Sequence, residues 1–492
     1  MPEFDPAHFD PVAYINTPRW QASRLGLERI RALLDRLGRP QDRLRFVHVA
    51  GTNGKGSVCA YLASILQAAG YCTGLFTSPY LERFEERIRV DGAMIPEADL
   101  RDATLAVREQ SEALANETGD HPTEFELMTA VALVHFACSG CDICVLEVGL
   151  GGRLDSTNVI DAPEVAVIAR IGLDHTAVLG NTLAAIAGEK AGIVKASCPV
   201  VSWPQEPEAM AVIERAAADR GCALRVADFA HLEEGRVAWP AAGTSEAGGC
   251  AAEAASTAAA NGDGPASADV AERAQGDATD CAALPLRRFS YKGFDALETR
   301  LVSSYQPQNA AVALEAVEVL RERGWNIPDE AVRRGVARTR WPGRFEIVEG
   351  GVAPDGFAIV VDGGHNPQGA RALVDALSEV FPVRKPVFVI GVLEDKDYAQ
   401  MLEEVLPLGS AFVCVAPDSP RALPARKLAR AIRWTGQDLL GCSACVNPYV
   451  ARDARDAIAS ARDLAGPDGL ICAFGSLYSI GALKAAIRET RP

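Results

Sequence analysis

The residues with the clearest chemical signature form a glycine-rich loop, Gly51-Thr52-Asn53-Gly54-Lys55-Gly56-Ser57. The loop follows an apolar run, Phe46–Ala50, and precedes a predicted amphipathic helix, Ser57–Ala69, which Gly70 ends. Glycines let backbone N–H groups approach phosphate oxygens, and Lys55 can reach the outer phosphates. The start of a helix adds partial positive charge. We therefore predict a nucleotide phosphate site in an enzyme that uses ATP.

The spacing within this loop differs from the common phosphate-loop motif, in which Ser or Thr follows the lysine directly. Here Gly56 separates Lys55 from Ser57, and Val49 stands six positions before Lys55, where the common motif has glycine. A predicted strand, a lysine and a predicted helix nevertheless surround the loop in the required order. This context favours phosphate binding over a purely structural turn.

Polar residues also follow two other apolar runs. Glu147 lies at the carboxyl end of the run Ile143–Val148, where open α/β sheets place their ligands. A carboxylate there can bind a metal ion or act as a base, and it can equally form a structural ion pair, for example with Arg153. The run Val165–Ile171 is followed by Gly172-Leu173-Asp174-His175, whose last two residues can ligate a metal or orient a ligand.

Later segments carry further polar residues. Lys190 lies among small and apolar neighbours in a predicted helix, where a surface lysine is the ordinary expectation. The apolar run Phe357–Val361 leads into Asp362 and His365, followed by Asn366-Pro367, which suits a helix cap and a first helical turn. Capping does not explain Asp362 or His365, so this second half of the chain is expected to contribute to the same site across a cleft.

Short apolar runs alternate with amphipathic stretches, the pattern of parallel sheets covered by helices. The predicted strands are Phe46–Ala50, Thr73–Thr77, Ile143–Val148, Val165–Ile171 and Val200–Ser202, then Phe357–Val361, Val387–Val392, Ala411–Val415 and Leu470–Phe474. A predicted helix, Ala425–Trp434, lies between two strands of the second series. We predict an α/β fold of two domains, a phosphate-loop ATPase domain over residues 1–340 and a Rossmann-like parallel-sheet domain over residues 345–492.

The segment between Ala241 and Cys281 consists mostly of Ala, Gly, Ser, Thr and acidic residues, without one Leu, Ile or aromatic side chain. Such a composition cannot bury enough apolar surface to fold. Residues 241–283 are therefore predicted to be a disordered insertion that carries no chemistry.

The composition of the whole chain limits its class. With 492 residues and 48% hydrophobic residues, the chain can bury a large core. It has no apolar stretch of membrane-spanning length and no secretory signal, so we expect a soluble cytoplasmic protein. A net charge of −16 opposes general binding of nucleic acid or anionic membrane. Any anionic substrate must therefore be held by local cations, backbone amides or metal.

The chain contains thirteen cysteines, which in the absence of an export signal favours reduced thiols over a disulfide framework. Cys138, Cys141 and Cys144 are closely spaced, as are Cys442 and Cys445, but a zinc site would have to join the two groups across about 300 residues. We expect these cysteines to serve packing.

Several motifs together resemble the folylpolyglutamate and dihydrofolate synthases of the Mur ligase superfamily. In family order they are Gly26–Ile30, Gly51–Ser57, Thr77–Leu81 with Glu86-Arg87-Ile88, Glu147–Asn158, Leu173–His175, Glu189–Ile193, Pro342–Arg344, Asp362–Pro367, Asp395–Asp397 and Gly475–Tyr478. The resemblance covers nearly the whole chain outside the insertion, and so many ordered motifs make coincidence very improbable.

The resemblance implies a reaction and a set of site residues. ATP phosphorylates a folate carboxylate, and the α-amine of L-glutamate attacks the acyl phosphate, which needs positioning and charge neutralisation by ATP-bound Mg²⁺. The implied catalytic residues are Lys55, Glu147, His175 and Lys190; the implied Mg²⁺ ligands, for two ions, are Ser78, Glu147, His175 and a carbamylated Lys190. The implied ATP contacts are Thr52, Asn53, Gly54, Lys55, Gly56, Ser57, Asn309, Arg344 and Asp362, and the implied substrate contacts are Thr123, Phe125, Glu126 and Leu154.

The chain departs from the family at two motif positions, since Tyr80 stands where His is common and Gly364 where Ala is common. The first change adjoins Ser78 and affects expectations for substrate geometry.

Two other functions are less consistent with the motifs: a Mur ligase acting on a UDP-sugar peptide, and a phosphate-loop kinase or nucleotide-regulated module. We expect a bifunctional monomeric enzyme acting on dihydropteroate and reduced folate.

Overall fold

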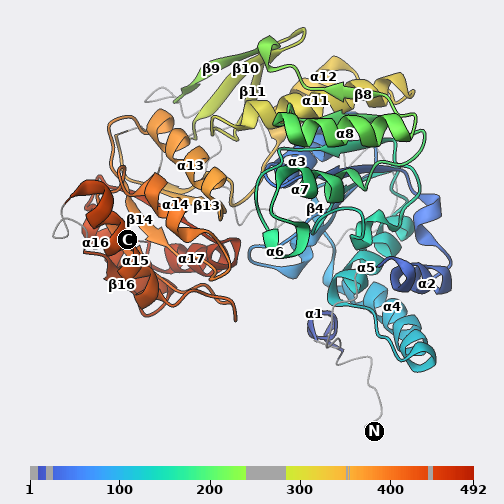
Figure 1. Ribbon diagram of the computed structural model, residues 1–492, viewed down its shortest axis with the longest axis horizontal. Helices are drawn as coiled ribbons and strands as arrows, with labels where there is room; N and C mark the ends of the chain where they lie inside the picture. The colour runs from blue at the N-terminus through green and yellow to red at the C-terminus, as the bar shows by residue number, and fades with distance from the viewer. Residues whose placement is uncertain are drawn as a thin grey trace, which may run out of the picture.

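The structure is a computed structural model that describes residues 9–17, 26–239, 284–350, 353, 355–441 and 447–491 (Figure 1). The predicted insertion, residues 241–283, lies outside the described residues, as do Cys442 and Cys445. In Figure 1 the C-terminal part, coloured orange to red, lies beside the larger part coloured blue to yellow.

The first half of the chain forms an eight-stranded sheet in the order β4-β3-β2-β5-β1-β6-β7-β8. Its strands are β1 (Phe46–Ala50), β2 (Thr73–Phe76), β3 (Ile88–Val90), β4 (Ala93–Met94), β5 (Ile143–Glu147), β6 (Val165–Ile168), β7 (Val200–Ser202) and β8 (Leu224–Val226). The six strands from β2 to β8 are parallel, and only β3 and β4 run antiparallel. The five strands predicted for this half are therefore confirmed as β1, β2, β5, β6 and β7, whereas β3, β4 and β8 were not predicted.

Both faces of this sheet are covered, because successive residues of a strand point to opposite sides. Val47 and Val49 pack in one cluster with α3, α11 and α12, whereas Leu146 packs with α4 and α5 and Ala50 with α7 and α8. The helices of this half are α1 (Pro11–Asn16), α2 (Glu28–Arg36), α3 (Lys55–Ala68), α4 (Glu97–Thr118), α5 (Glu124–Cys138), α6 (Thr176–Leu179), α7 (Leu183–Ala191), α8 (Pro207–Asp219), α11 (Gln306–Glu322) and α12 (Asp329–Arg338). Short 3₁₀ turns are η2 (Pro40–Arg43), η3 (Phe84–Arg87), η4 (Ser156–Val159) and η5 (Phe229–His231).

The helix after the phosphate loop is not amphipathic as predicted. It packs on β1, β2 and β5 on one side and on α11 and α12 on the other. The five consecutive residues Val58, Cys59, Ala60, Tyr61 and Leu62, which together point to every side of the helix, are all buried. The helix is therefore a central element of the core, which fixes the position of the loop that precedes it.

A small antiparallel sheet, β11-β10-β9, was not predicted. Its strands are β9 (Leu232–Ala238), β10 (Leu286–Tyr291) and β11 (Phe294–Thr299). Arg287 of β10 is fully buried and donates to the carbonyl oxygen of Val302 and to Oε2 of Glu379, at 2.7 and 2.5 Å. Since Glu379 belongs to helix α13 (Pro367–Val380) of the C-terminal part, this small sheet contacts both parts of the chain and joins them.

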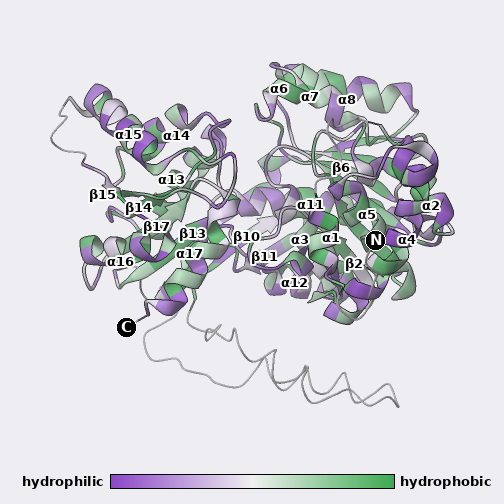
Figure 2. Cartoon of the chain, turned by 90° about the horizontal axis from the view of Figure 1, so that it is seen from below, coloured by the Kyte–Doolittle hydropathy of each residue, from purple (hydrophilic) through white to green (hydrophobic). Residues whose placement is uncertain are grey.

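The C-terminal part forms a six-stranded sheet in the order β12-β13-β17-β14-β15-β16, with β12 antiparallel to the rest. Its strands are β12 (Glu346–Gly350), β13 (Ala358–Asp362), β14 (Val387–Ile390), β15 (Ala411–Cys414), β16 (Tyr449–Val450) and β17 (Leu470–Phe474). Its helices are α13 (Pro367–Val380), α14 (Tyr398–Val405), α15 (Ala425–Leu440), α16 (Ala454–Ala465) and α17 (Leu477–Glu489). Val360 packs with α13, α14 and α15, and Ile359 packs with α16 and α17 on the other face. Figure 2 shows this apolar sheet between its two helix layers.

The two parallel sheets confirm the predicted α/β fold with a second parallel-sheet part. The chain passes from one sheet to the other through Trp341–Arg344, between α12 and β12. No helix in the described ranges is long and apolar enough to span a membrane.

Candidate active site

A pocket of about 610 Å³ lies where loops from both large sheets meet, a size typical of small-molecule sites. The carboxyl ends of β1, β2, β5 and β6 reach it from the first sheet, and those of β13, β14 and β17 from the C-terminal sheet. All site residues predicted from the sequence line this pocket: Thr52, Asn53, Gly54, Lys55, Gly56, Ser57, Ser78, Thr123, Phe125, Glu126, Glu147, Leu154, His175, Lys190, Asn309, Arg344 and Asp362. The structure thus brings together residues that are up to about 300 positions apart.

Backbone hydrogen bonds to the segment after β6 fix the phosphate loop in place. The backbone N–H groups of Thr52 and Asn53 both donate to the carbonyl oxygen of Arg170, which follows β6. Gly54 adopts a left-handed conformation with φ of 85° and starts α3, a backbone shape that suits glycine. A side chain at Gly56 would lie 2.8 Å from the Trp341 indole, so the extra glycine in this motif makes room for the segment that joins the two sheets.

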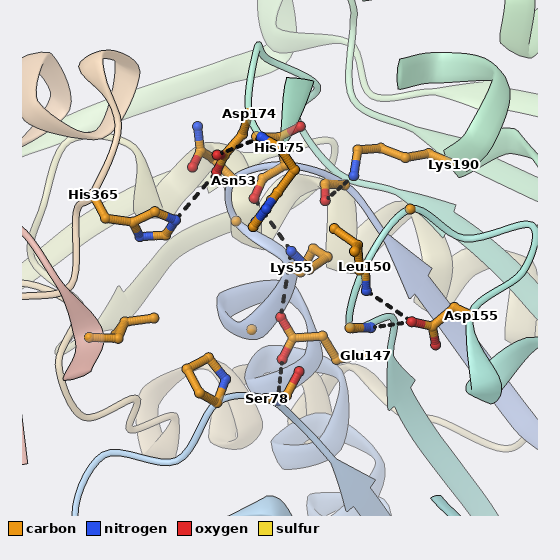
Figure 3. Close-up of a pocket in the computed structure, with 18 of the residues that line it drawn as sticks. Asn53, Lys55, Ser78, Glu147, Leu150, Asp155, Asp174, His175, Lys190 and His365 are labelled. Carbon is orange, nitrogen blue, oxygen red and sulfur yellow. Dashed lines mark hydrogen bonds and ion pairs between the residues drawn. The ribbon is translucent and has the colours of Figure 1, made fainter. Parts of the chain in front are cut away.

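Glu147, Lys55 and Ser78 converge in the middle of the pocket (Figure 3). Oε1 of Glu147 lies 3.9 Å from Nζ of Lys55, and Oε2 accepts the backbone N–H of Ser78 at 3.2 Å. The alternative ion pair between Glu147 and Arg153 is wrong, because Arg153 pairs with Glu189 at 2.9 Å. Burial raises the pKa of the Glu147 carboxyl, against the attraction of Lys55, so the protein holds a poorly compensated carboxylate here.

His175 directly precedes α6 and has a left-handed backbone, with φ of 50°. Its backbone N–H donates to Oδ1 of Asp174 at 2.8 Å, and its ring lies near Lys55 in Figure 3. Burial, with a smaller contribution from Lys396, lowers the pKa of His175 to about 4. The imidazole is therefore neutral near pH 7 and keeps a lone pair for a cation.

Lys190 is buried, so the expectation of a surface lysine is wrong. Its Nζ donates to the carbonyl oxygen of Gly51 at 2.8 Å, directly at the start of the phosphate loop (Figure 3). Burial, reinforced by repulsion from Lys55, lowers the pKa of Lys190 to about 7. A large share of this amine is therefore neutral and nucleophilic near pH 7.

The donor set near Glu147 fits Mg²⁺. Among the described residues, no three His, Cys, Asp or Glu side chains gather into a complete metal cage. Mg²⁺ does not need one, because it keeps several waters and binds through one or two carboxylates together with substrate phosphates. The poorly compensated Glu147 carboxylate, the Ser78 hydroxyl and neutral His175 line the pocket beside the phosphate loop and match this mode of binding.

Contacts across the pocket join the two parts of the chain. Asn53 of the phosphate loop donates to Oε1 of Gln368 at 2.5 Å, and Nδ2 of Asn366 donates to Oδ1 of Asn53 at 3.1 Å. Oδ1 of Asp174 accepts a hydrogen bond from Nζ of Lys396 at 2.6 Å. Oδ2 of Asp174 lies 3.4 Å from Nε2 of His365. Burial opposes ionisation of Asp174, but His365 and Lys396 outweigh it and lower its pKa.

The predicted nucleotide contacts outside the loop lie on one side of it. Oδ1 of Asn309 packs against Gly54, and Gln306 links Asn309 to Ser57 through hydrogen bonds of 3.2 Å. Asp362 is buried and accepts from the backbone N–H groups of Phe345 and Gly364, at 2.8 and 2.7 Å. Asn366 caps α13 and Pro367 is its first residue, as predicted.

The predicted acceptor contacts lie at the start of α5. Thr123 and Glu126 form a capping box there, and Glu126 also accepts Nε of Arg29 at 2.6 Å. Phe125 packs 5.9 Å from the Phe76 ring, centre to centre, and touches Gly149. The ring therefore forms an apolar wall beside the end of β5, where a planar ligand can lie.

Sequence reasoning missed several residues of this pocket. Asp155 accepts the backbone N–H groups of Gly149 and Leu150, at 3.0 and 2.9 Å, and so shapes the loop after β5 (Figure 3). Lys396 and Arg87 also line the pocket. All three lie within the motifs that carry the family resemblance, but only the fold shows that these residues line the pocket.

Two family descriptions match the chain, "Mur ligase middle domain" over residues 49–226 and "Mur ligase, glutamate ligase domain" over residues 343–477. The dihydrofolate synthase/folylpolyglutamate synthase of Bacillus subtilis is 34% identical over 97% of this chain and 100% of its own length. The folylpolyglutamate synthase of Lacticaseibacillus casei is 34% identical over 98% of both chains. A solved complex of a folylpolyglutamate synthase with AMPPCP and folate covers 98% of this chain and 99% of that one, with a TM-score of 0.74 and 30% identity. These similarities span both sheets and the pocket between them.

Proposed function

The chain belongs to the folylpolyglutamate and dihydrofolate synthase family of Mur ligases, and from this premise we propose that it uses ATP to join L-glutamate to folates. The acceptors are a reduced folate and dihydropteroate, and the products are the amide, ADP and phosphate. The relatives named for both activities support bifunctionality.

The observation that carries this proposal is the pairing of two chemistries in one pocket. Lys55 and Glu147 lie on one sheet edge, where they suit a phosphate and its metal ion. Lys396 and His365 lie on the facing edge of the C-terminal sheet, where both contact Asp174. The ammonium group of Lys396 has three N–H donors, so it suits a carboxylate of an amino acid in addition to Asp174. A phosphorylated acceptor formed on the first edge can therefore be attacked by an amine held on the second.

The reaction proceeds in two displacements. An oxygen of the acceptor carboxylate attacks the γ-phosphorus of ATP, and the bond from that phosphorus to ADP breaks. The glutamate nitrogen, after losing a proton, then attacks the acyl carbon, a C–N bond forms, and phosphate leaves with the original carboxylate oxygen. Lys55 and the backbone N–H groups at the start of α3 balance the phosphate charge, and closure of the pocket excludes water.

Ser78, Glu147 and His175 are the proposed ligands of a first Mg²⁺, which would neutralise phosphate charge when bound. For a second Mg²⁺ we propose a carbamylated Lys190, supported by the lowered pKa of this buried amine. The neutral amine attacks the carbon of CO₂, an N–C bond forms and a proton is released. The carbamate that forms is an anion. The buried lysine thereby changes from a cation into a ligand that can bind a cation.

The proposed domains are residues 1–340 and 345–492, in keeping with two hydrophobic clusters, one formed by residues before Trp341 and one formed by residues after Arg344 together with Val302. We also propose a monomer, because residues of one chain line both walls of the pocket. A cytoplasmic location is proposed because ATP is the energy source.

The proposed function is tested with purified protein, ATP, Mg²⁺ and L-glutamate, offered dihydropteroate and tetrahydrofolate separately. ADP release must require both glutamate and an acceptor, and mass spectrometry must find each acceptor extended by one glutamate. Turnover with only one of the two acceptors would show that the enzyme is not bifunctional. The absence of a glutamate-dependent product from either acceptor would refute the assignment.

A further inference from the structure

Arg87 is a pocket residue whose positive charge has no assigned use. It ends the turn η3 and lines the pocket with Ser78 and Glu147. Its Nε is buried and has no hydrogen-bond partner within the described ranges. In those ranges no carboxylate oxygen lies within 4.0 Å of its guanidinium, in contrast to Arg83 of the same segment, which pairs with Glu85 and Glu97. Arg87 as a whole is partly buried, and a partly buried guanidinium without an anionic partner is costly to desolvate.

The sheet topology places this guanidinium on a particular side of the pocket. The backbone N–H of Thr77 donates to the carbonyl oxygen of Arg87, so Arg87 lies beside the end of β2 and next to Ser78. In sheet order β3, β2, β5 and β1, the edge carries Arg87, then Ser78, then Glu147, then Lys55. Arg87 is thus separated from the phosphate loop by the proposed Mg²⁺ ligands. The neighbouring strand β2 carries Phe76, which packs against Phe125 of the predicted acceptor contacts.

The segment around Arg87 is rigid. The Glu86 carboxylate accepts the backbone N–H groups of Leu81, Glu82 and Arg83, at 2.8 to 2.9 Å. This carboxylate fixes the path of the chain without using Arg87. A preorganised donor of this kind is suited to bind a ligand without further ordering.

Two aromatic rings hold the guanidinium itself. Cζ of Arg87 lies 4.9 Å from the Tyr80 ring centre and 5.8 Å from that of Phe84, and the two rings pack 6.0 Å apart. The ring faces attract the cation but leave its N–H donors free. Tyr80 stands where His is common, and a protonated imidazole would repel Arg87. The tyrosine therefore gives this chain a neutral platform for the cation.

We propose that Arg87, positioned by Tyr80 and Phe84, binds the acceptor carboxylate that ATP phosphorylates. This inference rests on the proposed function and adds the residue that presents the reacting carboxylate to the γ-phosphate. A guanidinium can engage both oxygens of a carboxylate, which holds the attacking oxygen in one orientation. Tyr80 acts through Arg87 and is a positioning residue.

The test compares an acceptor with its neutral analogue. The acceptor is the compound that the parent protein extends, either dihydropteroate or tetrahydrofolate. Its analogue has a carboxamide in place of the reacting carboxylate. Calorimetry measures the affinity of the protein for each compound. Binding is measured with AMPPCP and Mg²⁺ present. The parent should prefer the carboxylate by roughly 10- to 100-fold, and Arg87→Ala should bind the two compounds nearly equally. Arg87→Lys, which keeps a charge but loses the planar fork, should retain part of the preference.

The affinity for AMPPCP shows whether Arg87 binds the acceptor carboxylate or a phosphate of ATP. It should stay within about 2-fold of the parent in Arg87→Ala and Arg87→Lys, since the proposed partner is not a phosphate. A large loss of AMPPCP affinity with the carboxylate preference intact would overturn the inference. Unchanged preference in both folded variants would overturn it as well.

Matched variants test the role of the ring and of general charge. Tyr80→Phe should keep the carboxylate preference, whereas Tyr80→Leu should reduce it by roughly 3- to 10-fold. Arg83→Ala removes a neighbouring exposed arginine and should change nothing. If the parent protein extends its acceptor but Arg87→Ala still discriminates fully, only this inference fails; if the parent extends neither acceptor, the proposed function fails and this inference with it.

Discussion

Nζ of Lys190 lies 2.8 Å from the carbonyl oxygen of Gly51, the residue that opens the phosphate loop. The lysine is buried and its pKa is lowered to about 7, so near pH 7 the amine is partly protonated and partly neutral at the edge of the proposed ATP site. A group in this state reacts with CO₂ only in its neutral form, which links the proposed carbamate to pH.

Activation by bicarbonate should therefore depend on pH in a defined direction. With a pKa of about 7, roughly one tenth of the amine is neutral at about pH 6 and roughly nine tenths at about pH 8. Protein depleted of CO₂ and then incubated at equal dissolved CO₂ should regain activity about 10-fold faster at the higher pH. Initial rates are read at one common assay pH. Lys190→Arg, which cannot become neutral, is the control and should stay inactive at both; equal recovery rates at the two pH values would contradict the prediction.

Removal of the Glu147 charge should abolish turnover without unfolding the protein. Glu147→Gln keeps the shape and the acceptor for Ser78 N–H, but it loses the charge that attracts Mg²⁺. We expect a loss of roughly 100-fold or more in kcat and a higher Mg²⁺ requirement. The reaction should also stop with EDTA and return with Mg²⁺. Near-normal kcat and Mg²⁺ dependence in Glu147→Gln, with an unchanged thermal transition, would rule out this metal role.

The pair between Asp174 and Lys396 should stabilise the protein in a pH-dependent way. The pKa of Asp174 is lowered in the folded state, so its contribution is present above the unfolded carboxyl value, about pH 4, and is lost as pH falls below it toward the folded value. Urea unfolding at several pH values should show Asp174→Asn less stable than the parent near neutrality, with a gap that narrows below about pH 4. Asp395→Asn, at an exposed pair with Arg421, is the control. A gap that is constant with pH would contradict the charge argument.

The buried Arg287 should contribute far more stability than its neighbour Arg288. Arg287 is fully buried against Glu379 and the Val302 carbonyl, whereas Arg288 forms an exposed pair with Glu298. Arg287→Ala should lower the free energy of unfolding by about 2–4 kcal/mol, because the change removes a fully buried side chain and leaves the Val302 carbonyl without its donor. Arg288→Ala should cost about 1 kcal/mol or less. Both are measured by urea denaturation, and equal effects would show that the buried contact between the two parts of the chain is not stabilising.

Much of the fold was predictable because buried parallel strands are continuous apolar runs. The predicted limits Phe46–Ala50, Val200–Ser202 and Leu470–Phe474 are those of β1, β7 and β17. The run Val165–Ile171 continues past the end of β6 because the Arg170 carbonyl leaves the ladder to accept from the phosphate loop. An apolar pattern does not reveal such a change of partner.

The small sheet β9-β10-β11 was missed because its strands mix charged and apolar residues. Arg287 reads as a surface residue, but ion pairs and a carbonyl allow its burial. In the pocket, the sequence identified residues at strand ends, because parallel strands bring those ends to one edge. The contacts of Arg87, Asp155 and Lys396 depend on tertiary packing, and no local pattern could show them.

The most direct test of acyl-phosphate chemistry follows one oxygen atom. The acceptor is prepared with ¹⁸O in its reacting carboxylate and converted with ATP, Mg²⁺ and L-glutamate, and the released phosphate is analysed by mass spectrometry. Phosphate should carry one acceptor oxygen for every amide formed, because the phosphate leaves with the oxygen that attacked ATP. Amide formation with unlabelled phosphate, or with AMP in place of ADP, would contradict the proposed function.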